Sequence, residues 1–179
     1  MTEAGSVYGL ALYDLAQSEG LSEQILQELG VLRQSFAEEP DFIKLLSTPA
    51  LTKQERCDIL DKSFRGKIQP YLLNFLKILT EKGYIRHFSQ CCDAYRERYN
   101  QDHGILPVTA VTAIPLTDDQ QKRLTSKLET ITGKTVELHS RIDPSCLGGV
   151  RLDYDGKRVD DTVAHRLDAI RNLLKNTVL

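Results

Sequence analysis

Four histidines are the first residues to consider for chemistry in this chain of 179 residues. They are His87, His103, His139 and His165. A metal site needs several ligands that converge, and no second ligand stands at a helical or strand spacing from any of these histidines. The sequence therefore predicts surface or structural histidines and no metal ion.

Ser145 and Cys146 are the candidate nucleophiles, and they shortly precede the adjacent glycines Gly148 and Gly149. A nucleophile needs a base within hydrogen-bond reach, and no histidine lies near Cys146 in the sequence. The glycines follow an Asp-Pro-Ser turn, but neither G-x-x-x-x-G-K-S/T nor G-x-G-x-x-G is present. We therefore expect no nucleotide or other cofactor, and a small hydrolase using Ser145 or Cys146 remains the enzyme alternative.

Two pairs of carboxylates, Asp118 with Asp119 and Asp160 with Asp161, stand at predicted helix starts. Carboxylates at such positions accept backbone N–H bonds and favour the positive end of the helix dipole. Catalysis requires titratable groups that converge in a pocket, and the sequence contains no such set. We therefore predict structural roles for these aspartates and no catalytic residue.

The adjacent glycines are better explained by the elements around them than by a ligand. Glycine allows a tight entry into a strand, and Asp155-Gly156 then separates two short alternating runs, which is a strong hairpin signal. Apolar residues at helical spacing follow this hairpin, namely Val163, Leu167, Ile170 and Leu174. A hairpin that leads into a C-terminal helix is the predicted end of the chain.

Charge and cysteine usage exclude several classes of protein. The formal net charge of −2 provides no basic excess for nucleic acid. Residues 1–60 are acid-rich and residues 61–98 are basic, which suits either a partner surface or solvated helix faces. No apolar run approaches the ~18 residues of a membrane span, and no secretory leader pattern is present. The cysteines lack C-x-x-C spacing, so we expect reduced thiols at Cys57, Cys91, Cys92 and Cys146.

Residues 1–104 predict six short helices that form a compact bundle. Glycines or prolines end or start most of them, and Thr52 with Glu55 forms a capping box at the start of the fourth. These boundary residues are Gly20, Pro40, Pro49, Pro70, Gly83 and Gly104. We expect this helical domain to be the first of two.

Residues 105–179 predict a small β-α-β-β-α domain, which makes the whole chain α+β. Small apolar residues on both faces indicate a buried strand from Ile105. Thr117 with Gln120 forms a second capping box, which begins the helix that follows this strand. Gly133 ends the helix, and the run from Val136 to Ile142 alternates like a strand with one solvated face. No long linker separates the two predicted domains.

The fifth predicted helix has more apolar surface than one contact requires. Leu72, Leu76 and Leu79 belong to one stripe, and Asn74 and Ile78 mark a second stripe beside it. Periodicity alone allows a central helix that is surrounded on most sides. It also allows a groove, formed with part of the first helix, for the amphipathic helix of a partner.

Together these residues resemble the delta subunit of F-type ATP synthase, the bacterial relative of the oligomycin sensitivity conferral protein, over nearly the whole chain. The most specific matches lie in the glycine turn and the start of the last helix: Asp143, Pro144, Ser145, Leu147, Gly148, Gly149, Asp160, Thr162, Val163, Arg166 and Leu167. The N-terminal Tyr-x-x-Ala-Leu pattern and the fifth-helix Asn-apolar-Leu pattern supply the others: Tyr8, Ala11, Leu12, Asn74, Phe75 and Leu76. The chain departs from the family pattern at Val7, Tyr84, Cys146 and Thr162.

The resemblance implies a non-catalytic stator subunit without cofactor or metal, present in one copy per complex at the cytoplasmic face of the cell membrane. The N-terminal domain would bind alpha-subunit N-terminal segments and the C-terminal domain the b-subunit stalk, resisting torque during proton- or sodium-driven ATP synthesis. The implied alpha-subunit contacts are Tyr8, Ala11, Leu12, Leu15, Asn74 and Ile78. The alternative outside this family is a generic helical adaptor that binds an amphipathic partner helix.

Overall fold

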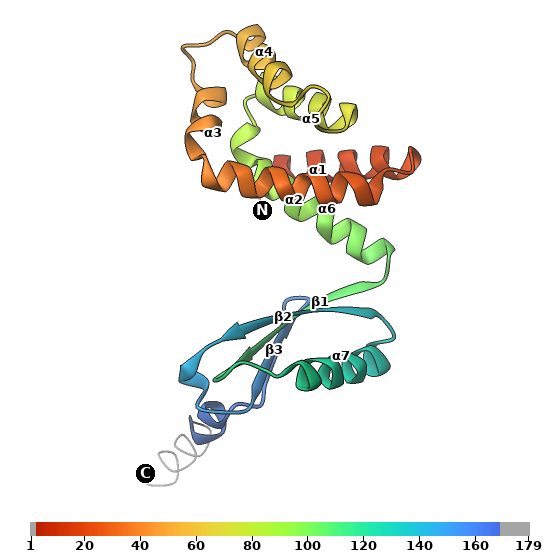
Figure 1. Ribbon diagram of the computed structural model, residues 1–179, viewed down its shortest axis with the longest axis vertical. Helices are drawn as coiled ribbons and strands as arrows, with labels where there is room; N and C mark the ends of the chain where they lie inside the picture. Colours follow the sequence, from red (N-terminus) through yellow and green to blue (C-terminus); the bar gives the residue numbers. More distant parts are fainter. Residues whose placement is uncertain (1–2, 169–179) are drawn as a thin grey trace. The chain divides into compact units, whose positions relative to one another are not determined.

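The structure of the chain is a computed structural model, and it describes residues 3–168. The chain divides into two compact units, a first that ends at Tyr99 and a second that begins at Asn100 (Figure 1). The first unit is helical and the second contains a four-stranded mixed sheet. The predicted α+β class is therefore confirmed.

The helices of the first unit lie where the sequence pattern placed them. They are α1 (Glu3–Ser18), α2 (Ser22–Glu38), α3 (Pro40–Ser47), α4 (Lys53–Phe64), α5 (Pro70–Glu81) and α6 (Phe88–Asp102), with the unpredicted 3-10 helix η1 (Ile85–His87) before α6. Pro40 and Pro70 occupy the first helical positions, where a missing N–H costs no hydrogen bond. At the start of α4, Glu55 N–H donates to Thr52 Oγ1 over 3.2 Å and Thr52 N–H donates to Glu55 Oε2 over 2.8 Å. The predicted capping box is therefore formed.

Helix α5 supplies the centre of the core of the first unit. Its residues Leu72, Leu76 and Leu79 are fully buried, as is Tyr95 of α6. The backbones of α1 and α6 approach closely at Gly9, where an added Cβ would lie 2.4 Å from the carbonyl oxygen of Cys91. Only glycine fits this contact without displacing one of the two helices.

The thiols of the first unit belong to this core rather than to a reactive site. Cys57, Cys91 and Cys92 are buried and unpaired with one another. Burial raises the pKa of Cys91 to about 11 and that of Cys92 to about 12. Since the thiolate is the nucleophile, we expect both thiols to react slowly with alkylating and oxidising reagents near neutral pH.

The second unit has the predicted element order. It contains β1 (Ile105–Thr112), α7 (Asp118–Thr132), β2 (Thr135–Ile142), η2 (Pro144–Cys146), β3 (Val150–Tyr154) and β4 (Lys157–Asp160), and residues 163–168 are helical. The strand order is β2-β1-β3-β4, with β1 parallel to β2 and the other neighbours antiparallel. Helix α7 connects the parallel pair and lies along one face of the sheet (Figure 1).

Burial along the strands agrees with the sequence pattern. On β1, Leu106 and Val108 face α7 and Val111 faces the other way, and all three are buried. On β2, Val136 is buried while Glu137 and Arg141 are exposed. Within residues 3–168, no helix is long and apolar enough to cross a membrane.

Candidate functional site

Helices α1 and α5 lie side by side and run in opposite directions. The rings of Tyr8, near the start of α1, and Tyr84, after the end of α5, are 5.7 Å apart. At the other end, the carboxylate of Glu19 accepts a hydrogen bond from Tyr71 and thereby raises the pKa of that phenol. These two contacts delimit a strip between the helices.

Most of the predicted contact residues lie on this strip. Leu15 and Ile78 are 41% and 45% exposed, Ala11 and Asn74 are exposed, and Tyr8 is half-buried. Leu12 differs, because it is 4% exposed and packs in the core. Leu12 therefore supports the strip from below and offers a partner almost no surface.

Helix α5 is the central helix of the first unit and also has an exposed stripe. It is central, since six of its residues are buried in the core: Leu72, Leu73, Phe75, Leu76, Leu79 and Thr80. The rest of its surface includes the exposed pair Asn74 and Ile78. An amphipathic partner helix needs such an apolar strip beside a well-packed support.

Val7 extends the strip beyond the predicted set, and Tyr84 lies at its end. Val7 lies one helical turn before Ala11 on α1 and is 59% exposed, and Tyr84 is partly exposed beside Tyr8. Sequence reasoning treated both only as departures from the family pattern. The four-residue spacing of Val7, Ala11 and Leu15 was the signal that could have included Val7. We call Val7, Ala11, Leu15, Asn74 and Ile78 the α1/α5 strip.

The glycine turn of the second unit is a structural junction. Leu147 and Gly149 have φ values of 62° and 79°, and Gly148 does not have positive φ. A Cβ on Gly149 would lie 2.4 Å from the carbonyl oxygen of Asp161, so the backbone after β4 passes directly over this glycine. At Gly148 a Cβ would lie 3.4 Å from Val163, which is an ordinary contact. Gly149 therefore allows the last helix to begin against the turn.

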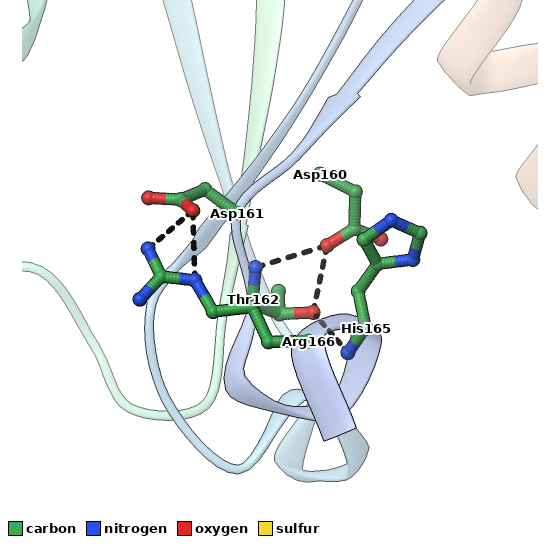
Figure 2. Close-up of polar contacts among 5 residues, drawn as sticks. All are labelled: Asp160, Asp161, Thr162, His165 and Arg166. Carbon is green, nitrogen blue, oxygen red and sulfur yellow. Dashed lines mark hydrogen bonds and ion pairs between the residues drawn. The ribbon is translucent and has the colours of Figure 1, made fainter. Parts of the chain in front are cut away.

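Thr162 caps that helix and Asp160 holds Thr162 in position, as Figure 2 shows. Asp160 Oδ1 accepts hydrogen bonds from the Thr162 hydroxyl and N–H, over 2.7 and 3.0 Å. Thr162 Oγ1 in turn accepts from His165 N–H over 3.2 Å. The hydroxyl and N–H of Thr162 lower the pKa of Asp160, so this carboxylate is held ionised. The prediction that Asp160 accepts a backbone N–H at the start of this helix is confirmed.

Two of the other paired aspartates, Asp119 and Asp161, form ion pairs. Thr117, rather than an aspartate, caps α7, and Asp119 forms an ion pair with Arg123 over 3.0 Å. Asp161 pairs with the guanidinium of Arg166 on the last helix (Figure 2). The prediction that Asp118 and Asp119 stand at a helix start is confirmed, because both lie in the first turn of α7. The ion pairs of Asp119 and Asp161 were not predicted.

The candidate nucleophiles are part of the same turn structure. Asp143 Oδ1 accepts from the hydroxyl and N–H of Ser145 over 2.5 and 3.0 Å, and these bonds lower the pKa of Asp143. Cys146 is buried beneath the turn. Among residues 3–168 no group of three or more histidine, cysteine, aspartate or glutamate side chains could hold a metal ion.

A second apolar surface surrounds the start of the last helix. Leu167, expected to be a structural residue, is 53% exposed, and Val163 is also exposed. Leu147 of the glycine turn and Val159 of β4 are exposed as well. The predicted helix residues Ile170 and Leu174 lie outside the described residues. We call Leu147, Val159, Val163 and Leu167 the last-helix surface.

Known proteins resemble the chain along nearly its whole length. The family model described as ATP synthase delta (OSCP) subunit matches residues 5–174. The ATP synthase subunit delta of Enterococcus hirae is 33% identical over 171 residues, which cover 95% of this chain and 94% of that protein. The subunit delta of Clostridium kluyveri is 30% identical over 167 residues, covering 93% and 92% of the two chains.

One solved structure shares the fold. A chain of the Toxoplasma gondii mitochondrial ATP synthase hexamer superimposes with a TM-score of 0.72 at 24% identity. The match covers 97% of this chain and 98% of that chain. Both units of the chain therefore have a counterpart in a single solved protein.

Proposed function

Because this chain belongs to the ATP synthase delta (OSCP) subunit family, we propose that it joins the catalytic head of the enzyme to the b-subunit stalk through separate surfaces on its two units. The family is a non-catalytic stator component of ATP synthase, a membrane-bound complex. One copy would serve each complex, placed peripherally at the cytoplasmic face of the cell membrane. A connector of this kind makes and breaks no covalent bond.

The helical domain predicted for residues 1–104, which contains the first unit, would bind N-terminal segments of the alpha subunits. The observation that carries this proposal is the α1/α5 strip, where Leu15 and Ile78 are exposed on neighbouring helices above a tightly packed core. The helices α1 to α6 would act as the bundle that holds this strip rigid. An amphipathic alpha-subunit helix would bury its apolar stripe between α1 and α5.

Acidic residues of the first unit suit a partner with basic residues. Asp14 is exposed on α1, and Glu19 lies at the end of the strip that is closed by Tyr71. Exposed charges at the rim of an interface affect association rate and specificity more than affinity. The apolar strip would therefore hold the partner, and the acidic rim would steer it.

The domain predicted for residues 105–179, which lies within the second unit, would bind the b-subunit stalk. The last-helix surface gives it exposed leucines and valines next to the Asp160–Thr162 cap, which fixes the direction of the helix. Gly149 and the hairpin position this surface relative to the sheet. A stalk helix would thus meet a preformed apolar surface.

The mechanical demand on such a connector is slow dissociation while torque is applied. Buried apolar contacts in preformed surfaces supply this better than exposed ion pairs, which contribute about 0–1 kcal/mol each. The α1/α5 strip and the last-helix surface are both mainly apolar. Each unit would therefore hold its partner without any chemical step.

Replacing Ala11 with aspartate tests the head-binding proposal. The Ala11→Asp variant would bury an unpaired carboxylate against the apolar stripe of the partner helix, and we expect binding to weaken by about 2–4 kcal/mol, roughly 30- to 1,000-fold. Isothermal titration calorimetry with a synthetic alpha-subunit N-terminal peptide measures this loss. Gln17→Asp is the matched control, because Gln17 is exposed on α1 away from the strip.

The control separates local charge from net charge. We expect Gln17→Asp to bind like the unmodified chain, while both variants keep the circular dichroism spectrum of a helical fold. Equal affinities of Ala11→Asp and the unmodified chain, with the fold intact, would rule out the α1/α5 strip as the binding site.

A further inference from the structure

Strand β2 forms an outer edge of the sheet, with β1 as its neighbour. The hydrogen bonds between β1 and β2 begin with Thr135 N–H, which donates to the Gly104 carbonyl over 3.0 Å. They end with Asp143 N–H, which donates to the Thr112 carbonyl over 2.8 Å. In a parallel ladder every second residue directs its backbone polar groups to the neighbouring strand. Val136, Leu138, Ser140 and Ile142 therefore direct theirs outward.

This outer edge is closed at one end and open at the other. The carboxylate of Glu129, on α7, accepts a hydrogen bond from the outward N–H of Val136 over 3.2 Å. Within residues 3–168, the N–H groups of Leu138, Ser140 and Ile142 have no comparable acceptor. An open row of backbone donors and acceptors is a template for another strand.

A depression of about 440 Å³ lies beside the open half of this edge. It is lined by Asp118, Gln121, Lys122, Thr125, Ser126 and Leu138. Leu138 is half-buried and Ile142, on the same face of β2, is exposed. Every second side chain of a strand added here would lie on this face, beside α7. Apolar side chains at these positions would contact Leu138 and Ile142.

The opposite face of β2 sets the charge of the incoming strand. Glu137 and His139 lie 3.5 Å apart and interact with each other. The exposed Arg141 forms no ion pair among the described residues, although its charge, after the Ser145 hydrogen bonds, helps to lower the pKa of Asp143. A carboxylate on an added strand would therefore compete with Asp143 for this guanidinium and could form the direct ion pair that Asp143 does not form.

We propose that β2 accepts an extended segment of a partner chain as a fifth strand, paired with Leu138–Ile142. The segment carries alternating apolar side chains toward α7 and an acidic side chain toward Arg141. The site uses residues outside the α1/α5 strip and the last-helix surface, so it does not depend on either. Main-chain hydrogen bonds supply affinity and the alternating side chains supply selectivity.

Nuclear magnetic resonance on the isotope-labelled full chain tests this proposal. The probe is a short acetylated and amidated peptide of alternating valine and glutamate. We expect it to shift the amide signals of Leu138, Ser140 and Ile142 and to slow their hydrogen exchange. A version of this peptide with every second backbone nitrogen methylated has no N–H donors on one edge of its strand. It should bind at least about tenfold more weakly.

Two variants make the test specific to the edge and to the charge. Ser140→Pro removes one outward N–H while leaving the β1 ladder intact, and should weaken binding by about the same factor. Arg141→Glu should transfer the preference to a peptide of alternating valine and lysine. The proposal is overturned if the β2 amides do not respond, if the methylated peptide binds equally well, or if unmodified chain prefers the lysine peptide.

Discussion

Replacing Gly149 with alanine should destabilise the second unit strongly, for two separate reasons. At φ +79° an alanine is in the left-handed region, which costs about 1–2 kcal/mol. Its Cβ would also lie 2.4 Å from the Asp161 carbonyl oxygen and 3.1 Å from the Thr162 Cα, and displacing packed backbone costs about 1–3 kcal/mol. We therefore expect the free energy of unfolding to fall by about 2–5 kcal/mol.

Gly156→Ala is the matched control for this substitution. Gly156 has φ +68° in the hairpin turn, but nothing lies within 4 Å of the position of an added Cβ. This variant should lose only the conformational part, about 1–2 kcal/mol. The difference in unfolding free energy between the two variants then gives the cost of the contact between the added Cβ and the backbone that follows β4.

Urea unfolding followed by the amide signals of β1 measures the stability of the second unit alone. We expect Gly149→Ala to unfold at a clearly lower urea concentration than Gly156→Ala. The slope of the unfolding free energy against urea concentration should be the same for both variants. Equal midpoints for the two variants would refute the argument that Gly149 is required by the passage of Asp161 over it.

Three further predictions concern the first unit, the thiols and pH. Gly9→Ala should lower the free energy of unfolding of the first unit by about 1–3 kcal/mol, measured in urea, because α1 and α6 must move apart. Gly30→Ala in α2 should raise it by about 0.5–1 kcal/mol, because nothing lies within 4 Å of the added Cβ. Loss of stability in both variants would contradict this reasoning. Cys91 and Cys92 should resist iodoacetamide at pH 8 in the native chain and react after denaturation, as mass spectrometry can show; rapid native labelling would contradict their burial. Because the pKa of Asp160 is lowered in the folded chain, the free energy of unfolding of the second unit should decrease as the pH falls below 3.8, the ordinary pKa of an aspartate. This decrease should be steeper than in the Asp160→Asn variant. Identical pH profiles of the two chains would show that the cap does not depend on the charge of Asp160.

The elements that local chemistry determines were predictable from sequence. Prolines at the first helical positions, the Thr52–Glu55 capping box and the Asp155-Gly156 turn each act within a few residues. Asp155 and Gly156 both have positive φ, at 48° and 68°, as a tight hairpin requires. Such signals need no knowledge of the rest of the fold.

Features that depend on distant contacts could not be predicted in this way. Nothing near Gly9 in the sequence indicates that Cys91 packs against it. A packing partner far away in the chain decides the role of this glycine.

The exposure of the predicted contact residues could be foreseen only in part. Periodicity identified the face of α1 that carries Ala11 and Leu15, but it could not separate these exposed positions from Leu12, which α5 and its neighbours cover. It also omitted Val7, because its type departs from the family pattern. Exposure at a helix edge depends on how closely the next helix approaches, and that distance is a tertiary property.

The central claim is that one chain holds two partners at once. Co-sedimentation of the purified alpha/beta head with a soluble b-subunit stalk, with and without the chain, tests it most directly. The account predicts that head and stalk sediment together only when the chain is present, and that Ala11→Asp releases the head while the stalk stays bound to the chain. Joint sedimentation without the chain, or a chain that binds neither partner, would contradict the account.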